Sequence, residues 1–218
     1  RRNGEWILKG ARMPSKMGVL SKVSGNLFDQ ALAALSNVVL SVIVARSLDA
    51  AGFGSFSIAY LVYGMAFAAM KSLVGQPLQI RFSASAPAEL VRRMGEGAGT
   101  TLSVSVVAAV GCALVGLAMG GTTGTALLIL AIWLPSLLVQ DYCRMALFAA
   151  TRPWSAALLD GIWAVVQFAL LAAFILNDRT DLHWLMGAWG AGALVSAIVG
   201  LAILRARPMV GATSRWLR

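Results

Sequence analysis

The chain has 218 residues, of which 59% are hydrophobic and 12% charged, with a formal net charge of +9 and a mean hydropathy of +0.78. A typical soluble domain carries roughly twice that share of charge, so the composition excludes an ordinary soluble globular protein. A membrane-spanning helix needs about 20 mostly apolar residues, and this length leaves room for about six with short connections. We therefore expect an all-α, polytopic membrane protein with six transmembrane helices.

The first 24 residues carry six basic side chains against one acid, Glu5, and are interpreted as a basic cytoplasmic lead segment. The first predicted span, Gly25–Ala45, has a polar stripe whose spacing of seven and four residues places it on one helical face: Asp29, Gln30, Ser36, Asn37 and Ser41. Lipid offers no hydrogen bonds, so the stripe is expected to face protein or water. Asn37 is expected to bond a neighbouring helix, whereas a functional and a structural role are equally open for Asp29.

The second predicted span covers Phe53–Met70, and the longest predicted connection, Lys71–Glu96, follows it. The second half of that connection, after Pro87, has the pattern of a helix that leads into the third span, Gly97–Met119. Small residues allow helix backbones to approach closely, which predicts a central place in the bundle for the third span. The glycines concerned are Gly111, Gly116 and Gly120.

The fourth predicted span, Ala126–Ala149, carries three polar residues whose spacing allows their heads to meet on one face: Gln140, Asp141 and Arg144. A charge inside a span costs roughly 2.5–3.5 kcal/mol per residue on insertion scales, and a pair that neutralises itself lowers that cost. Two interpretations stay open. The residues form a polar contact point in a substrate pathway, or Arg144 belongs to a structural ion pair and snorkels to the interface.

The fifth predicted span, Trp154–Leu176, has polar residues on one face at positions i, i+3 and i+7: Asp160, Trp163 and Gln167. A short polar loop separates it from the sixth span, His183–Leu204. Residues 205–218 are interpreted as a basic cytoplasmic tail or a linker between lobes. The two cysteines, Cys112 and Cys143, lie in apolar stretches without metal-ligand spacing, and no cofactor or metal is expected.

The basic residues outside the spans fall on one side of this topology, with the exceptions of Arg46 and Arg179. The positive-inside rule then predicts a multi-pass protein of the plasma (inner) membrane with both termini cytoplasmic. Orientation and anionic lipid head groups explain the net charge, so no nucleic-acid partner is expected.

Spans one, four and five present polar faces at matching depth and are hypothesised to line one vestibule open to the cytoplasm, joined by the hydroxyls that begin span three. The candidate substrate-cavity residues are Asp29, Gln30, Asn37, Gln140, Asp141, Arg144, Asp160 and Gln167. The competing interpretation is a set of separate interface residues, each near a helix end where charge is cheaper.

The stretch Leu27–Gly64 resembles the first helical pair of the polysaccharide flippase branch of the MATE-like MOP superfamily, which includes O-antigen (Wzx-type) flippases. The resemblance rests on Ala45–Arg46–Ser47–Leu48 at the end of span one and on the Gly52–Phe56 stretch that opens span two. Leu134–Pro153 also resembles the fourth helix of bacterial members. Where many relatives have Gly-Pro, this chain has Asp49–Ala50.

The resemblance implies two six-helix lobes around a central cavity, of which this chain is the N-terminal lobe, with a second lobe supplied in cis or by dimerisation. It implies that a lipid-linked oligosaccharide or polysaccharide precursor carrying a pyrophosphate crosses by alternating access. Arg144 is expected to contact the phosphate, because a guanidinium can form a bidentate contact with it. The carboxylates of Asp29, Asp141 and Asp160 are assigned to a cation, a proton or the tuning of Arg144. The remaining candidates would hydrogen-bond sugar hydroxyls: Gln30, Asn37, Gln140 and Gln167.

Two alternatives stay open beside this interpretation. A MATE-type cation-coupled antiporter would use the same lobe, and its acidic residues would bind a cation. The other alternative is a non-transporting assembly subunit or remnant. The glycines of span six would serve helix packing in any of these cases. An enzyme is not expected, because the single histidine, His183, lies at the outer edge of span six, where a general base is poorly placed.

Overall fold

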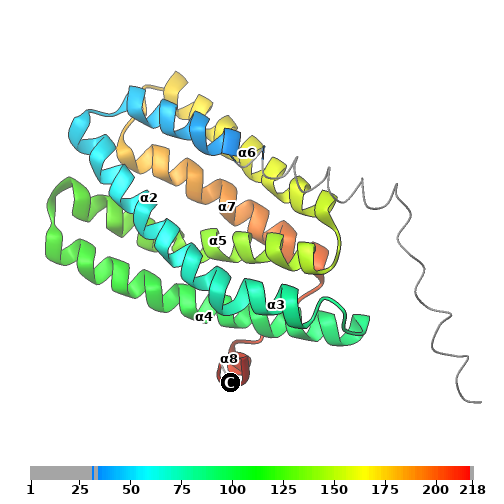
Figure 1. The fold of residues 1–218 in the computed structure, drawn as a ribbon. Helices are drawn as coiled ribbons and strands as arrows, with labels where there is room; N and C mark the ends of the chain where they lie inside the picture. Colours follow the sequence, from blue (N-terminus) through cyan, green and yellow to red (C-terminus); the bar gives the residue numbers. More distant parts are fainter. Residues whose placement is uncertain (1–30, 32–33, 217–218) are drawn as a thin grey trace, which may run out of the picture.

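The computed structural model describes residue 31 and residues 34–216 of the chain, which form helices and turns with no strand among them (Figure 1). The helices, in chain order, are one over Ala34–Ser47, α2 (Ala50–Met70), the π-helical η1 (Lys71–Gly75), α3 (Gln76–Arg81), α4 (Pro87–Met119), α5 (Gly121–Ala149), α6 (Pro153–Leu176), α7 (Leu182–Leu204), the 3₁₀ turn η2 (Val210–Ala212) and α8 (Thr213–Trp216).

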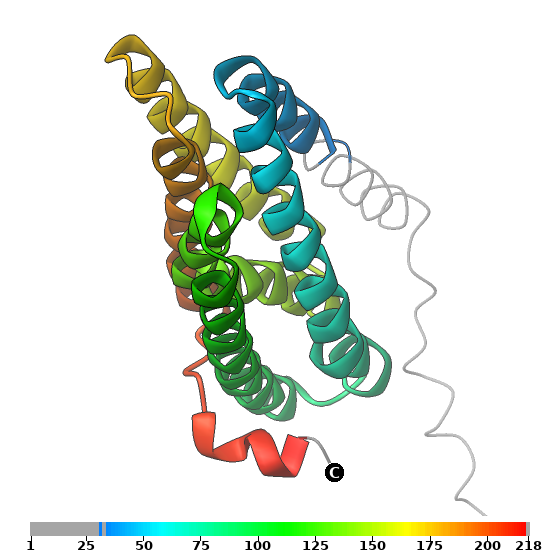
Figure 2. The same ribbon diagram turned by 90° about the vertical axis from the view of Figure 1, so that its left-hand side faces the viewer.

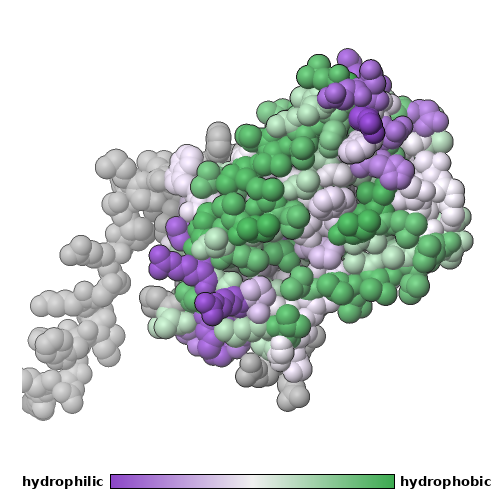
Figure 3. Space-filling view, turned by 180° about the vertical axis from the view of Figure 1, so that it is seen from behind, coloured by the Kyte–Doolittle hydropathy of each residue, from purple (hydrophilic) through white to green (hydrophobic). Residues whose placement is uncertain are grey.

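Five helices of 23 to 32 residues are long and apolar enough to cross a membrane, which confirms the all-α fold and the multi-pass pattern for five of the six predicted spans. The sixth, predicted over Gly25–Ala45, is described only in part, by the helix Ala34–Ser47. The rest of that span and the lead segment 1–24 lie outside the described residues. Figure 3 shows an apolar band on the bundle between two hydrophilic patches.

The prediction of a loop from Lys71 to Glu96 is wrong in its first half. The second helix continues through η1 to Arg81, and the chain reverses before α4 begins, as predicted, at Pro87. Pro77 has no N–H to donate to the carbonyl of Leu73, which would be its partner in an α-helix. The indole Nε1 of Trp216 donates to that carbonyl instead, at 3.1 Å.

Helix α5 occupies the centre of the bundle and contacts α2, α3, α4, α6 and α7. The prediction that the third span is central is therefore wrong. Helix α4 is an outer helix that packs closely on α5, where a Cβ at Gly116 or Gly124 would collide with the other glycine's backbone. A Cβ at Gly111, by contrast, would meet nothing within 4 Å. Small residues show that two backbones approach, but not which helix lies in the middle.

The segment after α7 folds back across the outer side of α4 (Figure 2). The N–H of Met209 donates to the carbonyl of Gly95 at 2.9 Å, and a Cβ at Gly99 would collide with the backbone of Met209. The ring of Trp216 packs on Phe82 at 5.9 Å between centroids. The predicted tail or linker thus docks on α4 and against Leu73 and Phe82.

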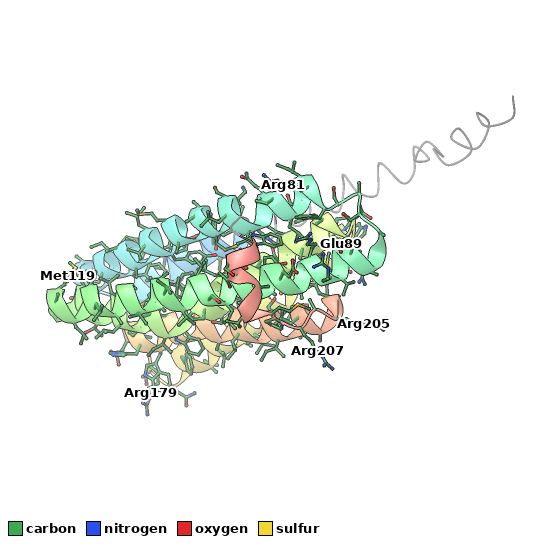
Figure 4. All side chains as sticks on the ribbon, turned by 90° about the horizontal axis from the view of Figure 1, so that it is seen from below. Arg81, Glu89, Met119, Arg179, Arg205 and Arg207 are labelled. Atoms are coloured by element: carbon green, nitrogen blue, oxygen red, sulfur yellow. The ribbon has the colours of Figure 1, made fainter. Side chains whose placement is uncertain are left out.

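Charged residues gather toward one end of the bundle. Figure 4 places Arg81, Glu89, Arg205 and Arg207 toward one end of it and Met119 at the other. Arg92 and Arg93 at the first end are held by Glu89 and Glu96 at 2.7–3.1 Å. This basic end is the one that the charge pattern predicts to be cytoplasmic.

The docked tail can be tested with Gly99→Leu. Overpacking costs about 1–3 kcal/mol, so undocking of the tail should increase about ten-fold. Trypsin cleavage after Arg205 in detergent-solubilised protein measures this opening, because the next residue, Ala206, is buried while the tail is docked. Gly111→Leu on the same helix is the matched control and should leave the cleavage rate unchanged, because its side chain meets open space. Equal rates for the two variants would contradict the docking.

Candidate polar cavity between four helices

A cavity of about 220 Å³ lies between the helix Ala34–Ser47, α2, α5 and α6. Its polar wall residues come from three of these elements: Ser36, Asn37, Asp141, Arg144, Asp160 and Gln167. Five of the eight sequence-predicted candidates therefore line one cavity. Asp29 and Gln30 lie outside the described residues, and Gln140 lies behind the wall.

The centre of the cavity wall is an ion cluster built by α5 and α6. The Nη1 of Arg144 donates to Oδ2 of Asp160 at 3.0 Å, whereas Nη2 of Arg144 lies 3.9 Å from Oδ1 of Asp141. The sequence predicts Asp141 as the partner because it is three residues away on the same helix. The closer partner comes from α6, because helix packing brings Asp160 opposite the guanidinium.

The cluster is buried rather than turned to the interface. The carboxylates of Asp141 and Asp160 are 5% and 3% exposed, and the Arg144 side chain is 21% exposed. Two carboxylates therefore hold the guanidinium inside the bundle, about 7 Å along α5 from its last residue at a rise of about 1.5 Å per residue. This geometry disfavours the snorkelling interpretation.

Each carboxylate has a second donor. The hydroxyl of Tyr63 on α2 donates to Oδ2 of Asp141 at 2.6 Å, and Nε2 of Gln140 donates to Oδ1 of Asp160 at 3.0 Å. Hydrogen bonds to an ionised acceptor are short and strong, so these two contacts fix the carboxylate orientations. Gln140 is fully buried and holds Asp160 in place instead of facing the cavity.

The cluster carries one net negative charge when its carboxylates and guanidinium are ionised. Such a site favours a cation, a proton or ligand hydroxyl donors, and it opposes an anion that does not displace a carboxylate. Among the described residues, no group of three or more His, Cys, Asp or Glu side chains is placed to hold a metal ion. The cavity chemistry available is thus hydrogen bonding and charge, from residues already on its wall.

Aromatic side chains form most of the remaining wall. Tyr60, Tyr63 and Phe67 follow one face of α2, and Trp163 faces them from α6. Behind them Trp189 of α7 packs on Tyr63 at 5.0 Å between centroids, and its carbonyl accepts the Nε1 proton of Trp163 at 3.1 Å. The signal in the sequence was the spacing 60, 63 and 67, which places three rings on one helical face.

Two expectations about neighbouring residues are not met. The hydroxyls that begin α4 do not join the cavity: those of Thr100 and Ser103 donate to backbone carbonyls one turn earlier, at 2.9 Å each. Helix α4 packs on a different face of α5, which separates them from the site. The side chain of Asn37 forms no hydrogen bond with another described residue and stands in the cavity wall.

The ion cluster predicts a particular pattern of stability changes. Asp160→Leu removes the carboxylate that lies 3.0 Å from Arg144 and should lower the free energy of unfolding by about 3 kcal/mol. The double variant Arg144→Met/Asp160→Leu should cost less than the sum of the single changes, because it leaves no uncompensated guanidinium. Unfolding by SDS in mixed micelles measures both.

The matched control is Asp181→Leu, an exposed acid that caps no backbone N–H, with an expected change within about 0.5 kcal/mol. Additive effects at Arg144 and Asp160 would show that the pair does not act as a unit.

The cavity wall thus contains carboxylates, a guanidinium, amides and aromatic rings from four helices. Comparisons of this chain with known protein families, with curated proteins and with solved structures give no match.

Proposed function

We propose that this chain is one lobe of a multi-pass transporter of the plasma membrane, and that its cavity binds the sugar head group of a lipid-linked oligosaccharide. The observation that carries the proposal is the ion cluster of Asp141, Arg144 and Asp160 in the wall of a cavity between membrane-length helices. Ionisable residues inside membrane spans are costly and mark substrate or ion pathways. The resemblance of Leu27–Gly64 to polysaccharide flippases supplies the substrate class.

The cavity wall suits a sugar. Sugar hydroxyls donate hydrogen bonds to the carboxylates of Asp141 and Asp160, and the amides of Asn37 and Gln167 can both donate and accept. The aromatic rings offer flat apolar surfaces, as in most small-molecule sites. A volume of about 220 Å³ is below the roughly 300–1,000 Å³ of complete ligand pockets, so it fits part of a head group. In the proposed transporter, a second lobe would provide the facing wall.

The pyrophosphate is less well suited to this wall than the sugar. Arg144 is held by Asp160 at 3.0 Å, and the cluster has one net negative charge when ionised. A phosphate must therefore open the Arg144–Asp160 pair before it can take the bidentate contact. We accordingly assign sugar recognition to the resting cavity, and the phosphate contact of Arg144 to a step in which that pair is open.

A MATE-type cation-coupled antiporter is the second candidate, and the excess carboxylate favours it. In that case a monovalent cation or a proton would be the ligand of Asp141 and Asp160, and no sugar would bind. The two candidates share the lobe and the cavity, so ligand binding is the measurement that separates them.

Access from water can be tested with single cysteines in a variant that lacks Cys112 and Cys143. Asn37→Cys and Gln167→Cys should react with a small charged methanethiosulfonate reagent, because both positions line the cavity. Val165→Cys, two residues from Gln167 and 69% exposed on the outside of α6, is the matched control and should react at least ten-fold more slowly in lipid. If neither cavity position reacts, the cavity is not reached from water.

Ligand binding can be measured by titrating the purified protein with a short-chain lipid-linked oligosaccharide and following tryptophan fluorescence. Gln167→Leu removes an amide from the wall and should weaken binding about five-fold, the value of one neutral hydrogen bond of about 1 kcal/mol. Val165→Leu should bind like the wild type. If the oligosaccharide has no effect, and sodium changes the fluorescence of the wild type but not of a variant without Asp160, the antiporter is the correct candidate.

A further inference from the structure

A second hollow, of about 420 Å³, lies on a different face of α5, between α4, α5, α7 and the start of the tail. Its wall is apolar and includes Leu102, Trp133, Val139, Leu194, Ile198 and Leu201. The hydroxyl in the wall, on Ser136, already donates to the carbonyl of Trp133 at 2.7 Å. Such a wall favours a hydrocarbon chain, because a polar ligand would lose its hydrogen bonds to water there. We call this hollow the apolar groove.

The basic end of the apolar groove carries two arginines. Helix α7 ends at Leu204, and the left-handed backbone of Arg205 (φ 52°) turns the chain toward α4. Ala206 is then buried while Arg205 and Arg207 on either side of it are exposed, and Pro208 forms part of the groove wall. The hydrogen bond from Met209 to Gly95 holds this turn on α4. The backbone of both arginines is thus held next to Pro208 of the groove wall, and Figure 4 shows Arg205 and Arg207 toward one end of the bundle.

These two charges are available for a ligand. Neither Arg205 nor Arg207 forms an ion pair with a described residue, whereas Arg92 and Arg93 on the adjoining helix α4 are held by Glu89 and Glu96. Unneutralised guanidiniums beside an apolar groove complement a molecule with an anionic head and a hydrocarbon tail. The groove extends inward from that end by about 10 Å, the rise of α7 from Leu194 to Leu201.

We propose that the apolar groove binds one acyl chain of an anionic phospholipid, with its head-group phosphate between Arg205 and Arg207. The site is separate from the polar cavity and does not depend on the function proposed for that cavity. A zwitterionic phospholipid has the same chains but no net negative charge. The arginines therefore give the groove its preference for anionic over zwitterionic phospholipid. Each basic residue near a membrane surface contributes about five-fold to that preference, or more than ten-fold for the two together.

Trp133 in the groove wall reports occupancy directly. The protein is reconstituted in phosphatidylcholine vesicles that contain either phosphatidylglycerol or phosphatidylcholine with brominated acyl chains, which quench nearby indoles. The difference between the wild type and Trp133→Phe isolates the signal of this residue from the other tryptophans. We expect brominated phosphatidylglycerol to quench Trp133 with at least ten-fold higher apparent affinity than brominated phosphatidylcholine.

The arginines are tested by charge-matched double variants. Arg205→Gln/Arg207→Gln should reduce the ratio of the two apparent affinities to about one. The control, Arg46→Gln/Arg179→Gln, removes two positive charges that the chain carries elsewhere and should leave this ratio unchanged. Equal quenching of wild-type Trp133 by the two lipids would overturn the anionic site. Absence of quenching by either lipid would show that a second copy or another segment of the chain covers the groove, which also overturns the proposal.

Discussion

A guanidinium held between two carboxylates inside an apolar bundle ties together the helices around the cavity. Asp160 of α6 reaches Arg144 at 3.0 Å and compensates its buried charge, whose loss of a partner would be strongly destabilising. Asp141 in turn is bonded by Tyr63 of α2. The electrostatic requirement thus places α2, α5 and α6 at one relative depth and leaves the polar cavity between them.

Helix α5 divides the bundle into two chemical environments. One face presents Asp141 and Arg144 to the polar cavity, and another presents Trp133 and Val139 to the apolar groove. Close packing makes this division possible: Gly190 of α7 leaves room for the ring of Trp133, and Gly200 for Cys143. A transporter lobe with this arrangement would handle a polar head group on one side of its central helix and lipid on the other.

Much of the fold could be predicted from the sequence because hydropathy and charge act locally. Span positions follow from runs of apolar residues, and the start of α4 follows from Pro87. The extension of the second helix to Arg81 could not be predicted, since Pro77 is accommodated after the π-helical turn η1 and the distant Trp216 bonds the carbonyl of Leu73. Likewise, the hydroxyls of α4 have helical spacing like that of the cavity residues, and only packing places them elsewhere.

The sequence alone determined that the chain is helical, that it has membrane-length apolar segments with one basic end, and that polar residues share faces on three of them. These properties depend on residue type and on spacing along a single helix. The tertiary structure decided which faces meet. It brought Asp160 closer to Arg144 than Asp141 is, placed Gln140 behind the wall and brought Tyr63 to Asp141. Partner choice depends on distances between helices, and helical periodicity carries no information about those distances.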